Sequence, residues 1–100
     1  MKMIVVRGAV VGTAATFEEL KRICLEHTRR SRLEPGCISH EVSVDVEDAH
    51  KLIFFERWEN AEALKTHFAV PESIAMVKAL RKLSGSPGEI YIYDAETIRV

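Results

Sequence analysis

The chain has 100 residues, of which 47% are hydrophobic, and 14 lysines and arginines against 15 aspartates and glutamates give a net charge of −1. This length fits one domain, residues 1–100, and the near-neutral charge gives no long-range attraction for nucleic acid or an anionic membrane. No apolar run reaches the roughly 18 residues of a membrane span. We therefore expect a cytoplasmic protein without nucleic-acid or membrane partners.

The first strand and the first helix are predicted from residue types and spacing. Residues 2–11 are rich in valine and isoleucine, which indicates a strand. Thr16-Phe17-Glu18-Glu19 has the pattern of a capping box, in which the threonine and the second glutamate cap a helix start. An apolar stripe at i, i+3, i+4 spacing follows: Phe17, Leu20, Ile23, Cys24 and His27. Pro35-Gly36 is expected to stop the helix.

A hairpin is predicted next. From residue 37 the side chains alternate in polarity, as in a half-buried strand, and one face holds Ile38, His40, Val42, Val44 and Val46. Residues 47–50 are a polar turn. In the return strand, residues 51–58, one face holds Leu52, Phe54, Glu56 and Trp58. Glu56 needs a partner if it is buried, and Arg57 of a neighbouring chain, Arg7 and His40 are the candidates.

Two helices and a strand complete the chain. Asn60 is expected to cap a helix whose inward positions are Ala61, Leu64, His67 and Phe68. Pro71 suits the first turn of the next helix, whose inward positions are Ile74, Met76, Val77, Leu80 and Leu83. Residues 84–88 end that helix, and residues 90–94 form a strand with Tyr91 and Tyr93 on one side.

The predicted order is β-α-β-β-α-β, the ferredoxin-like arrangement of an α+β fold with a four-stranded antiparallel sheet. Helices cover one face of such a sheet, so the other face needs cover. A symmetric homodimer that pairs sheet to sheet would supply it. Cys24 and Cys37 are too few for a disulfide framework, and no cysteine or histidine spacing indicates a zinc site, so we expect reduced thiols and no metal.

From its first strand to Tyr93 the chain resembles the antibiotic biosynthesis monooxygenase family of dimeric α+β barrel proteins. The resemblance is carried by Glu34-Pro35-Gly36-Cys37, Phe55-Glu56-Arg57-Trp58-Glu59, Glu62-Ala63-Leu64, and His67 followed by Pro71. These motifs indicate the family and not a substrate. Its members include cofactor-independent oxygenases that form quinols or quinones, haem-degrading enzymes and an isomerase of a phosphorylated sugar, so the reaction stays open.

The resemblance implies a pocket between sheet and helices, with His67 facing it. His67 would be the catalytic general base that takes a phenolic proton from a small aromatic or quinol-like substrate. The resulting anion can pass one electron to O₂ without metal or flavin, in a dry apolar pocket. The alternative is a histidine that only packs or hydrogen-bonds beneath Trp58.

Other residues are candidates for substrate contact or support: Trp58, His40, Arg7 and Phe68 for substrate binding, and Glu56 for a structural or orienting role. Trp58 either lines the pocket or seals the junction of sheet and helix. His40 interrupts an aliphatic strand face, and Arg7 either binds an anionic substrate or pairs with an acid. His27 and His50 are expected to be structural or solvated.

Two other functions remain alternatives: a non-oxidative isomerase of a small polar or phosphorylated metabolite held by Arg7 or His40, and a non-catalytic dimer that binds small ligands. The resemblance also disfavours haem. The positions that match the site of the haem-degrading members are Arg7, His67 and Val77, and Val77 stands where those members have the histidine that binds the haem iron. The common Ser-Pro-His-Phe segment is Val70-Pro71-Glu72-Ser73 here, so a second pocket histidine found in some relatives is missing. We expect no cofactor.

Overall fold

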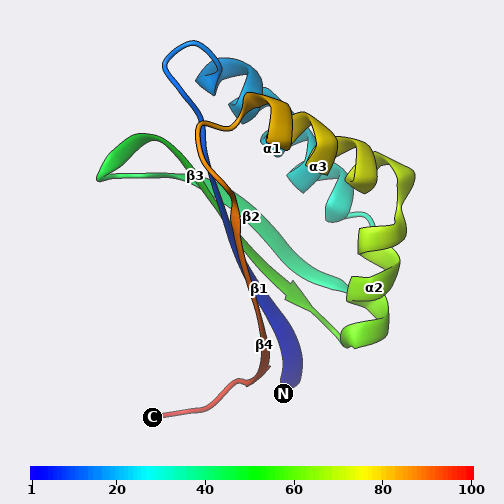
Figure 1. Ribbon diagram of the computed structural model, residues 1–100. Helices are drawn as coiled ribbons and strands as arrows, with labels where there is room; N and C mark the ends of the chain where they lie inside the picture. The colour runs from blue at the N-terminus through cyan, green and yellow to red at the C-terminus, as the bar shows by residue number, and fades with distance from the viewer.

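A four-stranded antiparallel sheet carries all three helices on one of its faces in the computed structural model, which covers residues 1–100 (Figure 1). The elements are β1 (Lys2–Val11), α1 (Phe17–Ser31), β2 (Cys37–Asp45), β3 (Asp48–Trp58), α2 (Ala61–Ala69), α3 (Pro71–Leu83) and β4 (Glu89–Glu96). The strand order β2-β3-β1-β4 confirms the predicted ferredoxin-like fold. None of the helices combines the length and apolarity needed to cross a bilayer.

The pairing register decides which side chains face the helices. Glu56 lies opposite Val6 on β1 and opposite His40 on β2, and paired residues share a face of the sheet. That face packs against the helices through two clusters of buried side chains: Val10, Leu20, Cys24, Leu52 and Phe54, and then Val6, Trp58 and Leu64. The polar residues His40 and Glu56 therefore lie on the helix-covered face, among the core side chains.

Helix α1 begins where predicted, but its predicted cap is wrong. Thr16 makes no side-chain cap bond; its hydroxyl donates to the carbonyl oxygen of Leu83 at 2.7 Å. Glu19 pairs with Arg22 and does not reach back to the helix start. Thr16 thus ties the start of α1 to the end of α3, a contact between residues far apart in sequence.

The tip of the β2–β3 hairpin also differs from the prediction. Val44 and Val46 are 45% and 100% exposed, although alternation placed them on the buried face. The hairpin tip extends beyond the helices (Figure 1), and the register shifts between Val44 and Asp45. No element covers the tip, so side chains there face solvent whatever their polarity.

The face of the sheet away from the helices is open. Phe55, Tyr91 and Tyr93 are 41%, 49% and 51% exposed there, and the two tyrosine rings stack with their centroids 6.5 Å apart. Arg7 lies on this same face and pairs with Glu89 at 3.1 Å. The open face therefore combines these aromatic rings with polar groups: the Arg7–Glu89 ion pair, Glu41 opposite Phe55, and Arg57, which donates to Ser39.

Candidate functional site

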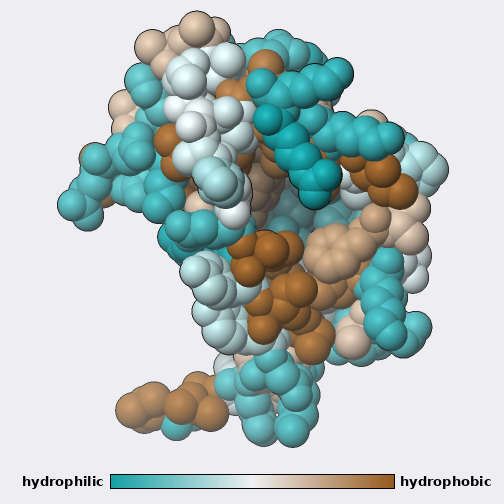
Figure 2. Space-filling view, in the orientation of Figure 1, coloured by the Kyte–Doolittle hydropathy of each residue, from teal (hydrophilic) through white to brown (hydrophobic).

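A cavity of about 830 Å³ opens between the sheet and the helices. Figure 2 shows the hollow on this side of the molecule, with hydrophobic side chains beside its mouth and hydrophilic ones above it. Its wall is largely apolar and includes Val6, Val10, Phe54, Phe68, Ile74, Met76, Val77 and Leu80. Ile74 and Val77 point inward as predicted, yet they are 47% and 41% exposed, because they line the cavity.

His67 reaches this cavity from the last turn of α2. The helix has the predicted cap, since the Asn60 side chain accepts from the backbone N–H of Ala63 at 2.9 Å. His67 is 3% exposed, and its Nδ1 lies 2.7 Å from Glu34 Oε1. A carboxylate only accepts, so Nδ1 carries a proton and Nε2 of the neutral ring offers a lone pair. His67 and Glu34 thus form a base and an orienting carboxylate.

The turn after α1 places Glu34. Gly36 has φ +81°, a conformation that glycine adopts without steric cost. A Cβ atom on Gly36 would lie 2.5 Å from Cβ of Ala63, so the turn packs directly on α2. The backbone N–H of Glu59 donates to the carbonyl oxygen of Gly36 at 2.8 Å. The Glu34-Pro35-Gly36 turn is therefore fixed against the same helix that carries His67.

Glu56 lies beneath His67 with two further polar neighbours. The Trp58 indole N–H donates to Glu56 Oε1 at 3.0 Å, and Nε2 of His40 and of His67 lie 3.3 and 4.0 Å from the same oxygen. Burial raises the pKa of Glu56, but His40 and the Trp58 N–H outweigh burial and lower it below its ordinary value. The carboxylate is thus held in its ionised form under the cavity.

His27 comes to the cavity from α1. Its Nδ1 lies 2.7 Å from Nη2 of Arg30, and because a guanidinium only donates, Nδ1 accepts and Nε2 carries the proton. Burial is the main cause that lowers the pKa of His27 to about 3, with further contributions from His40 and His67. His27 is therefore a neutral N–H donor on the cavity wall.

The structure brings some of the predicted site residues together and separates others. His67, Phe68 and Glu56 line the cavity. His40 is 1% exposed behind Glu56, and Trp58 is fully buried with its ring 4.6 Å from that of His67. Arg7 lies on the opposite face of the sheet, paired with Glu89; it does not join the others.

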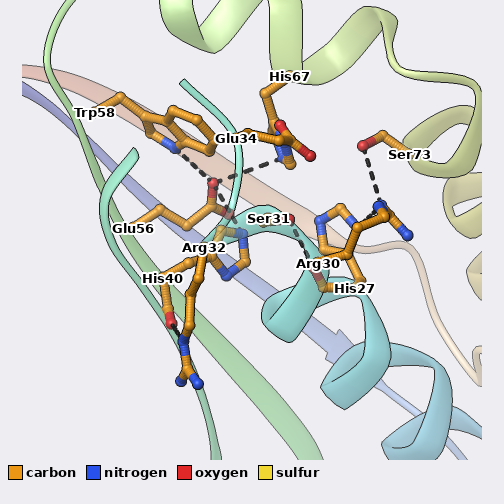
Figure 3. Close-up of polar contacts among 10 residues, drawn as sticks. All are labelled: His27, Arg30, Ser31, Arg32, Glu34, His40, Glu56, Trp58, His67 and Ser73. Atoms are coloured by element: carbon orange, nitrogen blue, oxygen red, sulfur yellow. Dashed lines mark hydrogen bonds and ion pairs between the residues drawn. The ribbon is translucent and has the colours of Figure 1, made fainter. Parts of the chain in front are cut away.

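Two residues of the site were not predicted. The sequence predicts His27 as one member of an apolar helix stripe, yet it lines the cavity. The feature of the sequence that could have indicated this role is a polar residue within an apolar stripe, with Arg30 one turn later. The sequence marks Glu34 only as part of the Glu34-Pro35-Gly36-Cys37 motif. His27, His40 and His67 now stand together, with ring centroids 5.1 to 5.8 Å apart (Figure 3).

Comparisons with known proteins agree with this architecture. The family model described as "Antibiotic biosynthesis monooxygenase" matches residues 3–79. An uncharacterized protein of Synechocystis is 37% identical over 95 residues, which cover 94% of this chain and 65% of the relative, so this chain spans under two thirds of that protein.

Solved structures share the fold over nearly their whole length. A Deinococcus radiodurans protein, named for the antibiotic biosynthesis monooxygenases, has TM-score 0.93 and 27% identity over 98% of both chains. A Mycobacterium tuberculosis protein has TM-score 0.88 and 18% identity over 97% of both chains, a likeness of fold alone.

Proposed function

Because the chain belongs to the antibiotic biosynthesis monooxygenase family, we propose that it oxidises a small aromatic or quinol-like substrate with O₂ and that this reaction needs neither metal nor flavin. The observation that carries the proposal is the Glu34–His67 pair at 2.7 Å, which leaves Nε2 of His67 as a proton acceptor at a cavity with largely apolar walls. A phenol bound there meets a base beside apolar side chains.

The proposed reaction begins when Nε2 of His67 takes the proton of a phenolic O–H. Glu34 stabilises the imidazolium that forms, as the carboxylate does in a histidine dyad. The Nε2–H of His27, fixed by Arg30, is placed to donate to the substrate oxyanion. The phenolate passes one electron to O₂, and recombination forms a C–O bond at a ring carbon, ortho or para to the phenolate oxygen, that still bears hydrogen. Loss of that ring proton with cleavage of the O–O bond gives an ortho- or para-quinone and water, so the substrate supplies all electrons.

Oxygen uptake by the purified protein on a panel of hydroquinones and polyphenols tests this proposal. We expect uptake above autoxidation for at least one member, and a loss of about 10² to 10⁴ fold in His67→Ala, since general-base catalysis contributes that much. His50→Ala is the matched control. This histidine lies in β3, packs on Phe17 of α1 and does not line the cavity. Uptake that survives in His67→Ala would place the base elsewhere, and no uptake on any substrate would reject the oxygenase.

The isomerase alternative has one supporting observation. Lys78 and Arg81 line the same cavity and suit an anionic group on a metabolite. The sequence suggested Arg7 and His40 as residues that bind the anion. Arg7 lies on the opposite face of the sheet, and His40 lies behind Glu56. An isomerase would turn its substrate over equally well without O₂, so the same assay under anaerobic conditions separates the two functions. A binding module would show ligand uptake and no turnover.

The open face of the sheet supports a homodimer. Phe55, Tyr91 and Tyr93 are about half exposed on a face that no helix covers, and burial of such a patch drives association. Sedimentation velocity should give a dimer for the wild type and a monomer for Phe55→Glu. Val46→Glu, at the fully exposed hairpin tip, should stay dimeric. A wild-type monomer at micromolar concentration would exclude this assembly.

A further inference from the structure

We propose that His27, His40 and His67, with Glu56 beside them, form a binding site for a divalent transition-metal ion such as Zn²⁺ (Figure 3). One ring nitrogen of each histidine lies within 4.8 Å of the other two. Two nitrogens on one tetrahedral zinc ion, with bonds of about 2.0 to 2.1 Å, are about 3.3 Å apart. Each ring therefore needs to shift inward by less than about 1 Å.

His40 provides an independent observation. Both of its ring nitrogens are buried, and neither has a hydrogen-bond partner, although Nε2 lies 3.3 Å from Glu56 Oε1. Buried polar atoms in proteins are nearly always satisfied, and an orphaned one points to a water or an ion. A metal ion among the three rings would give a ring nitrogen of His40 a bonding partner, whereas without an ion the ring has only the 3.3 Å contact of Nε2 with Glu56 Oε1.

The surroundings of the cluster match those of metal centres. Metal-binding histidines commonly donate their other ring N–H to a carboxylate, and His67 does so to Glu34 at 2.7 Å. Glu56 contributes a carboxylate oxygen within 3.3 and 4.0 Å of Nε2 of His40 and His67. Three imidazoles and one carboxylate suit Zn²⁺, Cu²⁺ or Fe²⁺ rather than Mg²⁺ or Ca²⁺. The cavity, which reaches His27, Glu56 and His67, provides the entry path.

The positive charge of Arg30 lies beside His27 and should weaken the binding of a metal ion there. Its Nη2 donates to Nδ1 of His27, which leaves the proton on Nε2; ligation through Nε2 requires that proton to move to Nδ1 and Arg30 to withdraw. The side chain has another partner available, because the same Nη2 lies 3.4 Å from Ser73 Oγ. Removal of the Arg30 charge should therefore strengthen metal binding, by about tenfold or more.

The metal site is proposed independently of the oxidation reaction, but a bound ion would affect that reaction. An ion on Nε2 of His67 occupies the lone pair that the base would use, so Zn²⁺ should inhibit the oxidation and a chelator should restore it. The oxidation assay run in chelator reports on the base alone, and metal binding is measured directly. Failure of one proposal is thus distinguishable from failure of the other.

The test is a titration of chelator-treated protein at neutral pH with Co²⁺, followed by visible absorption, and with Zn²⁺, followed by calorimetry. We expect one ion per chain in the wild type, loss of at least tenfold in affinity in His27→Gln and in His40→Ala, and tighter binding in Arg30→Met. His50→Ala should bind like the wild type, since this is the one histidine outside the cluster.

Thermal unfolding followed by circular dichroism accompanies each variant, and if His40→Ala does not fold, His27→Gln and His67→Asn carry the test. Absence of binding by the wild type at millimolar Zn²⁺ would overturn the proposal. Binding that persists in the cluster variants, or that His50→Ala abolishes, would overturn it as well. Weaker binding in Arg30→Met would exclude His27 as a ligand and with it the three-histidine site.

Discussion

Glu34→Gln is expected to lower the turnover number for substrate oxidation by about 10² fold or more, with little change in KM. Glu34 Oε1 lies 2.7 Å from Nδ1 of His67, and glutamine keeps an oxygen that can accept from the same N–H. The substitution therefore preserves ring orientation and removes only the negative charge. That charge matters once His67 has taken the substrate proton, so the loss should appear in kcat rather than in substrate binding.

Steady-state oxygen uptake, with kcat and KM determined separately, provides the measurement. Glu62→Gln is the matched control, because Glu62 lies on α2 with its side chain 84% exposed, and it should behave like the wild type. A Glu34→Gln protein with wild-type kcat would show that the carboxylate is structural. A rise in KM at constant kcat would assign Glu34 to binding.

Local pattern was enough to predict the fold. The alternation of residues 38–44 and the stripe at Leu20, Cys24 and His27 are periodicities that a strand and a helix impose on any half-buried segment. The errors arose where distant contacts override local chemistry. Thr16 bonds to Leu83, which no local pattern reveals, and Val46 is exposed because the hairpin extends beyond the helices.

The candidate site was predictable only where a motif marked it. His67 was named from a family motif, and its role as base stays a prediction, although the structure places it at the cavity with Glu34. The partners that define its chemistry are long-range: Glu34 is 33 residues earlier in the chain, and His27 reaches it only by packing of α1 on the sheet. The position of His27 in an apolar stripe predicts core packing, because the spacing of residues along a helix does not show whether the buried side faces packed side chains or a cavity.

Trp58 should be among the most sensitive positions for folding. Its side chain is fully buried, packs with Val6 and Leu64 and lies against the His67 ring. Trp58→Ala should lower the free energy of unfolding by about 3 to 5 kcal/mol, the usual cost of such a core truncation. Stability of a domain this size is about 5 to 15 kcal/mol, so the variant should be marginal in urea titration.

Trp58→Phe separates packing from hydrogen bonding at the same position. Phenylalanine retains much of the apolar volume but cannot donate to Glu56, whose buried carboxylate then loses the indole N–H at 3.0 Å. Loss of such a charge-assisted bond should cost about 1 to 3 kcal/mol, and the cost should shrink in a Glu56→Gln background, where no charge is stranded. An equal cost in both backgrounds would mean that Trp58 supports the site through its shape alone, and that the ionised state of Glu56 depends on His40 instead.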